Sequence, residues 1–148
     1  MKNLAYLTSP KMSSKEKKIL QERDFINKLS HLDQIWKCLK NRYGDILAVK
    51  DLRGKNQEEF SYSELDELIT KASKAFFNIG LRKGDVVTII SENSPRWLIA
   101  DQAIMRLSAI DAVRGINSPS VELDYIIKHS KSVGLIIQSN SIWEKLEN

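Results

Sequence analysis

Apolar residues in the central part of the chain form two kinds of pattern. The runs at 86–90 ("VVTII") and 133–137 ("VGLII") are continuous, as in strands buried on both faces, and 109–113 ("AIDAV") is a third short candidate strand. Before and between these runs the apolar residues recur every three or four positions, the spacing of one helical face. The clearest such stripe is Leu65, Leu68, Ile69, Ala72, Phe76 and Ile79. This alternation predicts an α/β domain with a partly parallel sheet and flanking helices.

Helix starts are predicted where a serine can cap the first turn. The candidate capping residues are Ser30, Ser61, Ser94, Ser118 and Ser141. Glu64 and Glu144 stand three residues after two of these serines, which is the spacing of a capping box. The helix after Ser94 is apolar nearly all round, so we expect it to be mostly buried. Before the second helix, residues 46–51 and 60–62 predict a short β-hairpin.

The chain ends on "SIWEKLEN", residues 141–148, which begins a helix of only about two turns. Helices this short are marginal by themselves. We expect Trp143 and Leu146 to lack the partners that the rest of such a helix would contact. The sequence therefore looks like part of a longer polypeptide.

The net charge of +4 lies entirely at the N-terminus. Residues 1–30 hold seven Lys and Arg against three Asp and Glu, and residues 31–148 hold sixteen of each. We expect residues 1–29 to form a disordered or loosely packed basic segment, and residues 30–148 to form the folded part. A transit peptide is a less favoured interpretation, because the segment is rich in Lys rather than Arg and contains Glu16. A nucleic-acid partner is disfavoured, since the folded part carries no basic excess.

Cysteine usage and hydropathy bear on location. The single cysteine, Cys38, cannot form an internal disulfide, which favours a reducing cytoplasm. No apolar run approaches the ~18 residues of a transmembrane helix. Peripheral association with a membrane stays compatible with this pattern.

The loops after the candidate strands lack the glycines of a phosphate-binding turn. Ser91 to Pro95 contains none, and the charge of Glu92 would repel a phosphate. A P-loop pattern is also absent from the sequence. A complete nucleotide site within these residues is therefore not expected.

Other candidate chemistry is weak. His31, Cys38 and His129 are too scattered for a zinc site. We expect Asp101 and Asp111 to lie apart, each in its own ion pair or cap. Arg114, at the end of a strand, is either a ligand contact or a structural ion pair, and the ion pair is favoured. Trp97, beside Arg96, is interpreted as a core residue rather than a stacking platform. No residue is predicted to be catalytic, cofactor-binding or metal-binding.

The order of several short motifs carries more information than any one of them. These motifs are "YSEL" (62–65), "GL" (80–81), "KGDVV" (83–87), "NSPRW" (93–97) and "ELDYI" (122–126) with Ser130. In this order, the region 30–148 resembles the N-terminal part of the AMP-forming acyl-activating enzymes, the adenylate-forming superfamily. Most members of the superfamily read "GAVxVP" where this chain has "SAIDAVRG" (108–115). The segment "DAVRG" (111–115) instead resembles the long-chain acyl-CoA and acyl-[acyl carrier protein] synthetases of cyanobacteria and plastids.

The resemblance implies a two-step ligase that uses ATP and Mg²⁺, with a fatty acid and CoA or acyl carrier protein as substrates. It also implies a partial N-terminal subdomain, because the phosphate loop and catalytic residues of the superfamily come after the region matched here. We therefore expect the fragment to be inactive alone and to bind no cofactor tightly. Two alternatives stay open: a non-catalytic interaction module derived from such a synthetase, and a stand-alone α/β domain that binds a small ligand.

Overall fold

The computed structural model describes residues 13–14, 29–52 and 57–147. The chain divides into two units, residues 1–35 and 36–148. Most of the segment 1–29, which is predicted to be loosely packed, lies outside the described residues. The 3₁₀ helix η3 (Leu32–Gln34) lies in the first unit, and α2 (Ile35–Tyr43) lies in the second unit except for its first residue. Ser30 was predicted to cap the helix that follows it. The structure shows no such cap, because the Ser30 hydroxyl and N–H bond to the Gln34 side chain instead.

The predicted β-hairpin is present. Strands β1 (Leu47–Lys50) and β2 (Glu59–Ser61) pair antiparallel, with Lys50 opposite Glu59. The Lys50 ammonium lies 2.9 Å from the Glu59 carboxylate across this pair. The hairpin leads directly into the longest helix among the described residues.

Helix α3 (Tyr62–Asn78) begins with the predicted capping box. The Ser61 hydroxyl accepts a hydrogen bond from the Glu64 N–H at 3.2 Å, and the Glu64 carboxylate accepts one from the Ser61 N–H at 2.8 Å. The helix ends where Gly80 takes a φ of +108°, a left-handed conformation that costs glycine little. The Leu81 N–H then donates to the Phe76 carbonyl, and the Leu81 side chain is buried over the end of the helix.

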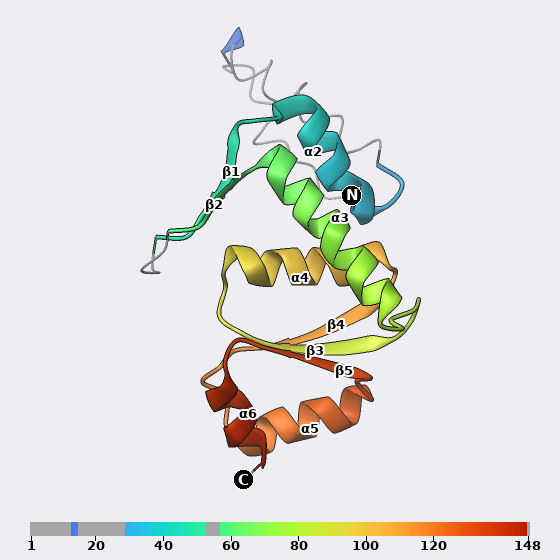
Figure 1. Cartoon of the computed structure of the whole chain (residues 1–148), viewed down its shortest axis with the longest axis vertical. Coiled ribbons are helices and arrows are strands. Elements are labelled where there is room, and N and C mark those ends of the chain that lie inside the picture. Colours follow the sequence, from blue (N-terminus) through green and yellow to red (C-terminus); the bar gives the residue numbers. More distant parts are fainter. Residues whose placement is uncertain (1–12, 15–28, 53–56, 148) are drawn as a thin grey trace. The chain divides into compact units, whose positions relative to one another are not determined.

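The sheet that organises the second unit is three-stranded and parallel. Its strands are β3 (Val86–Ile90), β4 (Ile110–Arg114) and β5 (Gly134–Ile137), in the order β4-β3-β5. Helix α4 (Pro95–Arg106) connects β3 to β4, and α5 (Ser120–Ser130) connects β4 to β5. Figure 1 shows α4 and α3 on one side of the sheet, and α5 and α6 (Asn140–Glu147) on the other. The predicted α/β architecture is confirmed.

Because side chains alternate along a strand, β3 contributes to an apolar core on each face. On the α4 face the buried residues are Leu81, Val87, Ile89, Ile104 and Ala109. On the α5 face they are Ile90, Leu123 and Ile142. The one buried polar side chain of β3, Thr88, shares a 2.6 Å hydrogen bond with the Ser132 hydroxyl. A short apolar run thus supports two helical layers.

Two predicted helix starts are shifted. Pro119 has a ψ of 147°, so it is the N-cap of α5 and the helix begins at Ser120, with no side-chain cap from Ser118. Helix α6 begins at Asn140, so Ser141 lies inside the helix rather than at its N-cap. The Ser141 hydroxyl bonds to that of Ser139.

Two predictions about packing are also wrong. Leu146 is partly buried against the core on the α5 face, because α6 folds back onto that side of the sheet. Ile79 was expected to continue the apolar stripe of α3, but it is 82% exposed because the helix has ended at Asn78.

Candidate functional site

The carboxyl ends of the three parallel strands meet at one edge of the sheet, which is where open α/β sheets bind ligands. The loop 91–94 follows β3, the loop 115–119 follows β4, and Gln138 follows β5. Gln138 ties two of these segments together. Its side-chain oxygen accepts the Glu92 N–H at 2.7 Å and the Ser91 hydroxyl at 3.2 Å. The turn after β3 is thus occupied by an internal amide contact.

Arg114 ends β4 at the same edge. Its guanidinium lies 3.2 Å from the Glu122 carboxylate on α5 and donates to the Val113 carbonyl at 2.7 Å. The structure shows the ion pair that the sequence favoured for this residue. Nearby, the Lys145 ammonium of α6 donates to the carbonyls of Ile116 and Ser118. Lys145 thus ties the loop after β4 to α6, while Arg114 ties the end of β4 to α5.

The residues at this edge do not fit the triphosphate of ATP. A phosphate site needs free backbone N–H groups at a helix N-terminus, but the Glu92 N–H is taken by Gln138. At the start of α4 the Trp97 N–H is taken by the Ser94 hydroxyl at 3.1 Å. The Glu92 carboxylate is exposed at the same turn and adds negative charge. We therefore derive no catalytic step through ATP or Mg²⁺ at these residues.

Two carboxyl groups meet where the sequence analysis had kept them apart. Asp101 of α4 and Asp111 of β4 share a side-chain hydrogen bond, and Asp101 is only 9% exposed. Burial raises the pKa of Asp101 to about 6, and the hydrogen bond and charge of Asp111 act in the same direction. The prediction of separate partners for these residues is wrong. Both side chains face the interface between α4 and the sheet, and only the fold brings them together.

A side-chain relay extends from this carboxyl pair to helix α2. The Gln102 amide donates to the Asp101 carboxylate at 2.7 Å, which lowers the pKa of Asp101. The Gln102 oxygen accepts the indole N–H of Trp36 at 2.6 Å. Residues from α2, α4 and β4 are therefore joined in one polar cluster. Nothing in the sequence spacing signals it.

The remaining candidates are structural. Trp97 is partly buried against the core on the α4 face, as predicted. Arg96 is exposed and bonds to Glu58, with its Nε 2.9 Å from a carboxylate oxygen, and this hydrogen bond lowers the pKa of Glu58. His129 stacks on Tyr125 at a centroid distance of 5.2 Å. Among residues 13–14, 29–52 and 57–147, no three His, Cys, Asp or Glu side chains are grouped so that they could hold a metal ion.

Comparison with protein-family models matches residues 37–148 to the model described as "AMP-binding enzyme".

In the part of the chain that the structure describes, no helix has the length and apolar character needed to cross a bilayer.

Two relatives come from Arabidopsis thaliana. The probable acyl-activating enzyme 16, chloroplastic, is 31% identical over 120 residues, which cover 81% of this chain and 17% of the relative. The long-chain-fatty-acid–[acyl-carrier-protein] ligase AEE15, chloroplastic, is 29% identical over 112 residues, covering 76% of this chain and 15% of the relative. The chain thus spans about a sixth of the length of these proteins.

A solved structure shares the fold. The NpsA N-terminal subdomain of Klebsiella oxytoca, in complex with 3-hydroxyanthranilyl-AMSN, matches with a TM-score of 0.69 and 26% identity. The match covers 76% of this chain and 28% of the subdomain chain. The larger part of that subdomain therefore has no counterpart in these residues.

Proposed function

The chain belongs to the AMP-binding enzyme family, and on this premise we propose that it is the N-terminal part of a ligase that activates a long-chain fatty acid. The observation that carries the proposal is the family match over residues 37–148, joined to a relative named as a long-chain fatty acid ligase of acyl carrier protein. The proposed domain begins at residue 30, where the charge excess of the N-terminal segment ends.

The proposed reaction of the complete enzyme has two steps. The fatty carboxylate attacks the α-phosphate of ATP, forming an acyl-adenylate and releasing pyrophosphate. A thiol, of CoA or of the phosphopantetheine group of acyl carrier protein, then attacks the acyl carbon and releases AMP. Magnesium neutralises phosphate charge in such reactions.

The role that we assign to this chain is scaffolding. Its parallel sheet supports one wall of the complete domain, while the residues that handle ATP belong to other parts of the enzyme. The geometry at the carboxyl edge supports this division. Glu92 and Gln138 close the turn after β3, and Arg114 is paired with Glu122. We therefore propose that residues 1–148 alone do not catalyse adenylate formation.

Two measurements test the proposal. ATP–pyrophosphate exchange with palmitate is expected to be at background for the purified 148-residue chain. A chimera in which residues 37–148 replace the matched segment of the Arabidopsis acyl-carrier-protein ligase is expected to retain exchange, with the unaltered ligase as control. Exchange by the 148-residue chain would contradict the scaffold role. A folded chimera without exchange would contradict the ligase assignment.

The proposed location is the cytoplasm. The support is the lone thiol, Cys38, which is half-buried in α2 and has no second cysteine with which to pair. Subcellular fractionation of the expressed chain, followed by thiol labelling, tests this location. Recovery in an organelle fraction would contradict it.

A further inference from the structure

The amino ends of the three parallel strands meet at the edge of the sheet opposite to the loops described above. Helix α3 reaches this edge through the turn 81–85. The Ile110 N–H at the start of β4 donates to the Asp85 carbonyl at 2.8 Å. On the other side of β3, the Val133 N–H donates to the Val86 carbonyl, also at 2.8 Å. The end of α3 and the starts of all three strands are therefore neighbours at this edge.

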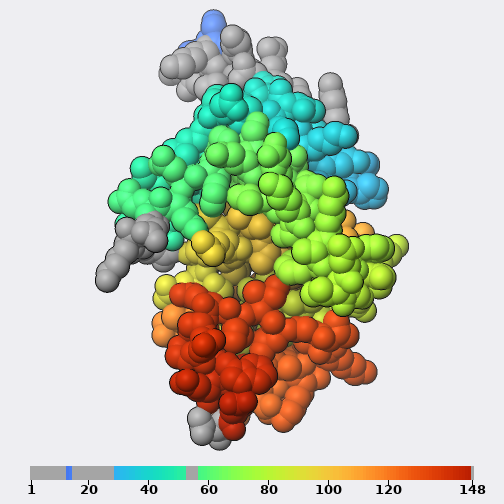
Figure 2. Space-filling view, viewed as in Figure 1, coloured from blue at the N-terminus to red at the C-terminus, as the bar shows by residue number. Residues whose placement is uncertain are grey.

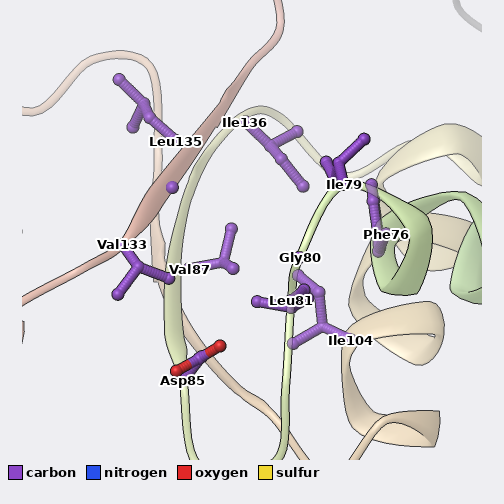
Figure 3. A pocket seen from close by; sticks show the side chains of 11 residues that line it. Phe76, Ile79, Gly80, Leu81, Asp85, Val87, Ile104, Val133, Leu135 and Ile136 are labelled. Atoms are coloured by element: carbon purple, nitrogen blue, oxygen red, sulfur yellow. The ribbon is translucent and has the colours of Figure 1, made fainter.

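Four apolar side chains near this edge are largely exposed. They belong to Phe77, Ile79, Ile110 and Val133, with exposed fractions of 50%, 82%, 53% and 66%. Ile79 and Val133 border one cavity of about 390 Å³, and Figure 3 shows them on two sides of it. Figure 2 shows the yellow-green end of α3 and the orange-red atoms just before β5 on the same side of the molecule. Exposed apolar surface of this kind, bordered by polar residues, marks a contact with a protein or a membrane.

The charges at this edge are of one sign. Residues 74–84, 103–110 and 125–134, which lead to or from it, contain six Lys and Arg residues and no Asp or Glu. Two of the six, Arg106 and Lys128, pair with carboxylates. The other four are exposed and take part in no salt bridge among the described residues, and they are Lys74, Arg82, Lys83 and Lys131. Because residues 31–148 carry no net charge, this excess is local.

The acidic residue of the turn, Asp85, does not oppose these cations at the surface. Its carboxylate accepts the Arg82 N–H at 2.7 Å, and Figure 3 shows its side chain well away from Ile79. The Arg82 guanidinium lies 4.0 Å from the centroid of the Phe77 ring and donates to the Phe77 carbonyl at 2.6 Å. The end of α3 thus presents an aromatic ring and a cation together.

We propose that this amino edge, with the four apolar and four cationic side chains given above, is a docking surface for a membrane that contains anionic phospholipids. Charge complementarity selects this occupant. Apolar side chains enter the headgroup region of a bilayer, while Lys and Arg beside them keep their charges at the lipid phosphates. A second copy of the chain is a poorer occupant, because a two-fold contact would bring the same four cations together.

Vesicle sedimentation of the whole 148-residue chain tests the surface. We expect the chain to sediment with phosphatidylcholine vesicles in which about a third of the lipid is phosphatidylserine, and to stay in solution with phosphatidylcholine alone. Raising the salt from about 0.1 M to about 0.5 M should weaken binding at least about tenfold, because salt screens exposed charges.

Two pairs of matched variants locate the contact. Lys83→Gln should weaken binding about fivefold. Its control is Lys37→Gln on α2, which lowers the net charge equally at an exposed position outside the edge. Ile79→Ser should weaken binding at least about threefold, because it removes apolar surface from the contact. Its control is Val121→Ser, at an 80% exposed position near the start of α5. Both controls should bind as the unaltered chain does, and the fold should tolerate changes at these exposed positions.

Three results would overturn the proposal. The first is that the chain does not bind anionic vesicles. The second is equal binding by all four variants, which would assign the contact to another part of the chain, such as the basic residues 1–30. The third is binding to heparin as tight as to vesicles and unaffected by Ile79→Ser, which would assign the edge to a soluble polyanion.

This inference goes beyond the proposed function and does not depend on it. Such a surface would hold a ligase of long-chain fatty acids beside the bilayer in which these acids dissolve. The vesicle measurements use neither ATP nor a fatty acid. Loss of exchange in the chimera would therefore reject the ligase assignment alone, and absence of vesicle binding would reject only the docking surface.

Discussion

The carboxyl groups of Asp101 and Asp111 share a hydrogen bond across the boundary between α4 and β4. Two carboxyl groups can bond in this way only if one of them carries a proton. Asp101 is the more buried of the two, and desolvation favours its neutral form. We therefore expect the contact between α4 and β4 to depend on pH.

The first prediction is that this pair destabilises the fold as the pH rises. The pKa of Asp101 is raised from 3.8 to about 6, so the native state binds more protons than the unfolded chain between those values. The contribution of the protonated Asp101 carboxyl to the free energy of unfolding is fully present below about pH 4 and is lost as the pH rises through 6. A shift of that size corresponds to at most about 3 kcal/mol. Asp101→Asn should abolish this part of the pH dependence, measured by urea unfolding from pH 4 to 7.

Asp124→Asn is the control for that experiment. Asp124 is exposed and pairs with Lys128 at 2.7 Å, so its replacement should leave the pH profile close to that of the unaltered chain. Parallel profiles for Asp101→Asn and the unaltered chain would contradict the proton-sharing pair.

The second prediction concerns the helix starts. The Ser94 hydroxyl caps α4 by accepting the Trp97 N–H, whereas Ser118 makes no cap for α5. Ser94→Ala should lower the free energy of unfolding by about 1 kcal/mol. Ser118→Ala should change it by less than about 0.5 kcal/mol. Urea unfolding followed by circular dichroism compares the two, and equal losses would show that the assignment of the caps is wrong.

The third prediction concerns an ion pair between α3 and α4. The Arg106 guanidinium lies 2.9 Å from the Asp66 carboxylate and also bonds to the Thr70 hydroxyl, and both charged side chains are less than one-fifth exposed. Arg106→Met should cost about 2 kcal/mol, since it leaves a largely buried carboxylate with only Lys40 at 3.7 Å. Lys128→Met breaks an exposed pair and should cost less than about 0.5 kcal/mol. Thermal unfolding of both variants checks the difference.

The elements that the sequence predicted well depend on short-range information. The capping box of Ser61 and Glu64 and the apolar run of β3 each involve a few consecutive residues, and both are present as predicted. The start of α5 was misjudged by one residue, because a proline can serve either as N-cap or as first helical residue. Asp111 could not be paired with Asp101 in advance, because that contact depends on how the chain turns after α4.

That turn has no glycine to signal it. Ser108 takes a φ of +55°, and the Ala109 N–H returns to the Ile104 carbonyl. The superfamily resemblance places a glycine at this position, where a left-handed conformation is needed. The exposure of Ile79 was likewise hidden, because helical spacing continues one residue beyond the end of α3. Long-range contacts and exact helix ends are thus what the pattern could not supply.

The fourth prediction follows from that serine. Left-handed backbone costs a non-glycine residue about 1 kcal/mol, and part of this cost is offset because glycine has more freedom in the unfolded chain. Ser108→Gly should therefore raise the free energy of unfolding by about 0.5 kcal/mol, measured by urea unfolding. The control is Ser120→Gly in the first turn of α5, which should lower the free energy of unfolding, because glycine disfavours a helix. Ser132→Gly is not used as the control, because the Ser132 hydroxyl bonds to that of Thr88. A loss of stability in Ser108→Gly would contradict the strain argument.

The fifth prediction tests the relay beside the carboxyl pair. Because the Gln102 amide donates to the Asp101 carboxylate, it favours the charged form and lowers the pKa of Asp101. Gln102→Met removes this donor while keeping a side chain of similar length, so the pKa of Asp101 should rise further above 6. The loss of stability should then move to higher pH by the same amount. A carbon-13 NMR titration of the Asp101 carboxyl, assigned with Asp101→Asn, measures the change.

Trp36→Phe is the companion variant for that titration. It removes the indole donor to the Gln102 oxygen but leaves the bond from Gln102 to Asp101 in place, so it should move the pKa of Asp101 less than Gln102→Met does. An unchanged or lower pKa in Gln102→Met would mean that Gln102 does not stabilise the charged carboxylate. A larger effect of Trp36→Phe would mean that α2 acts on the pair mainly by positioning the Gln102 amide.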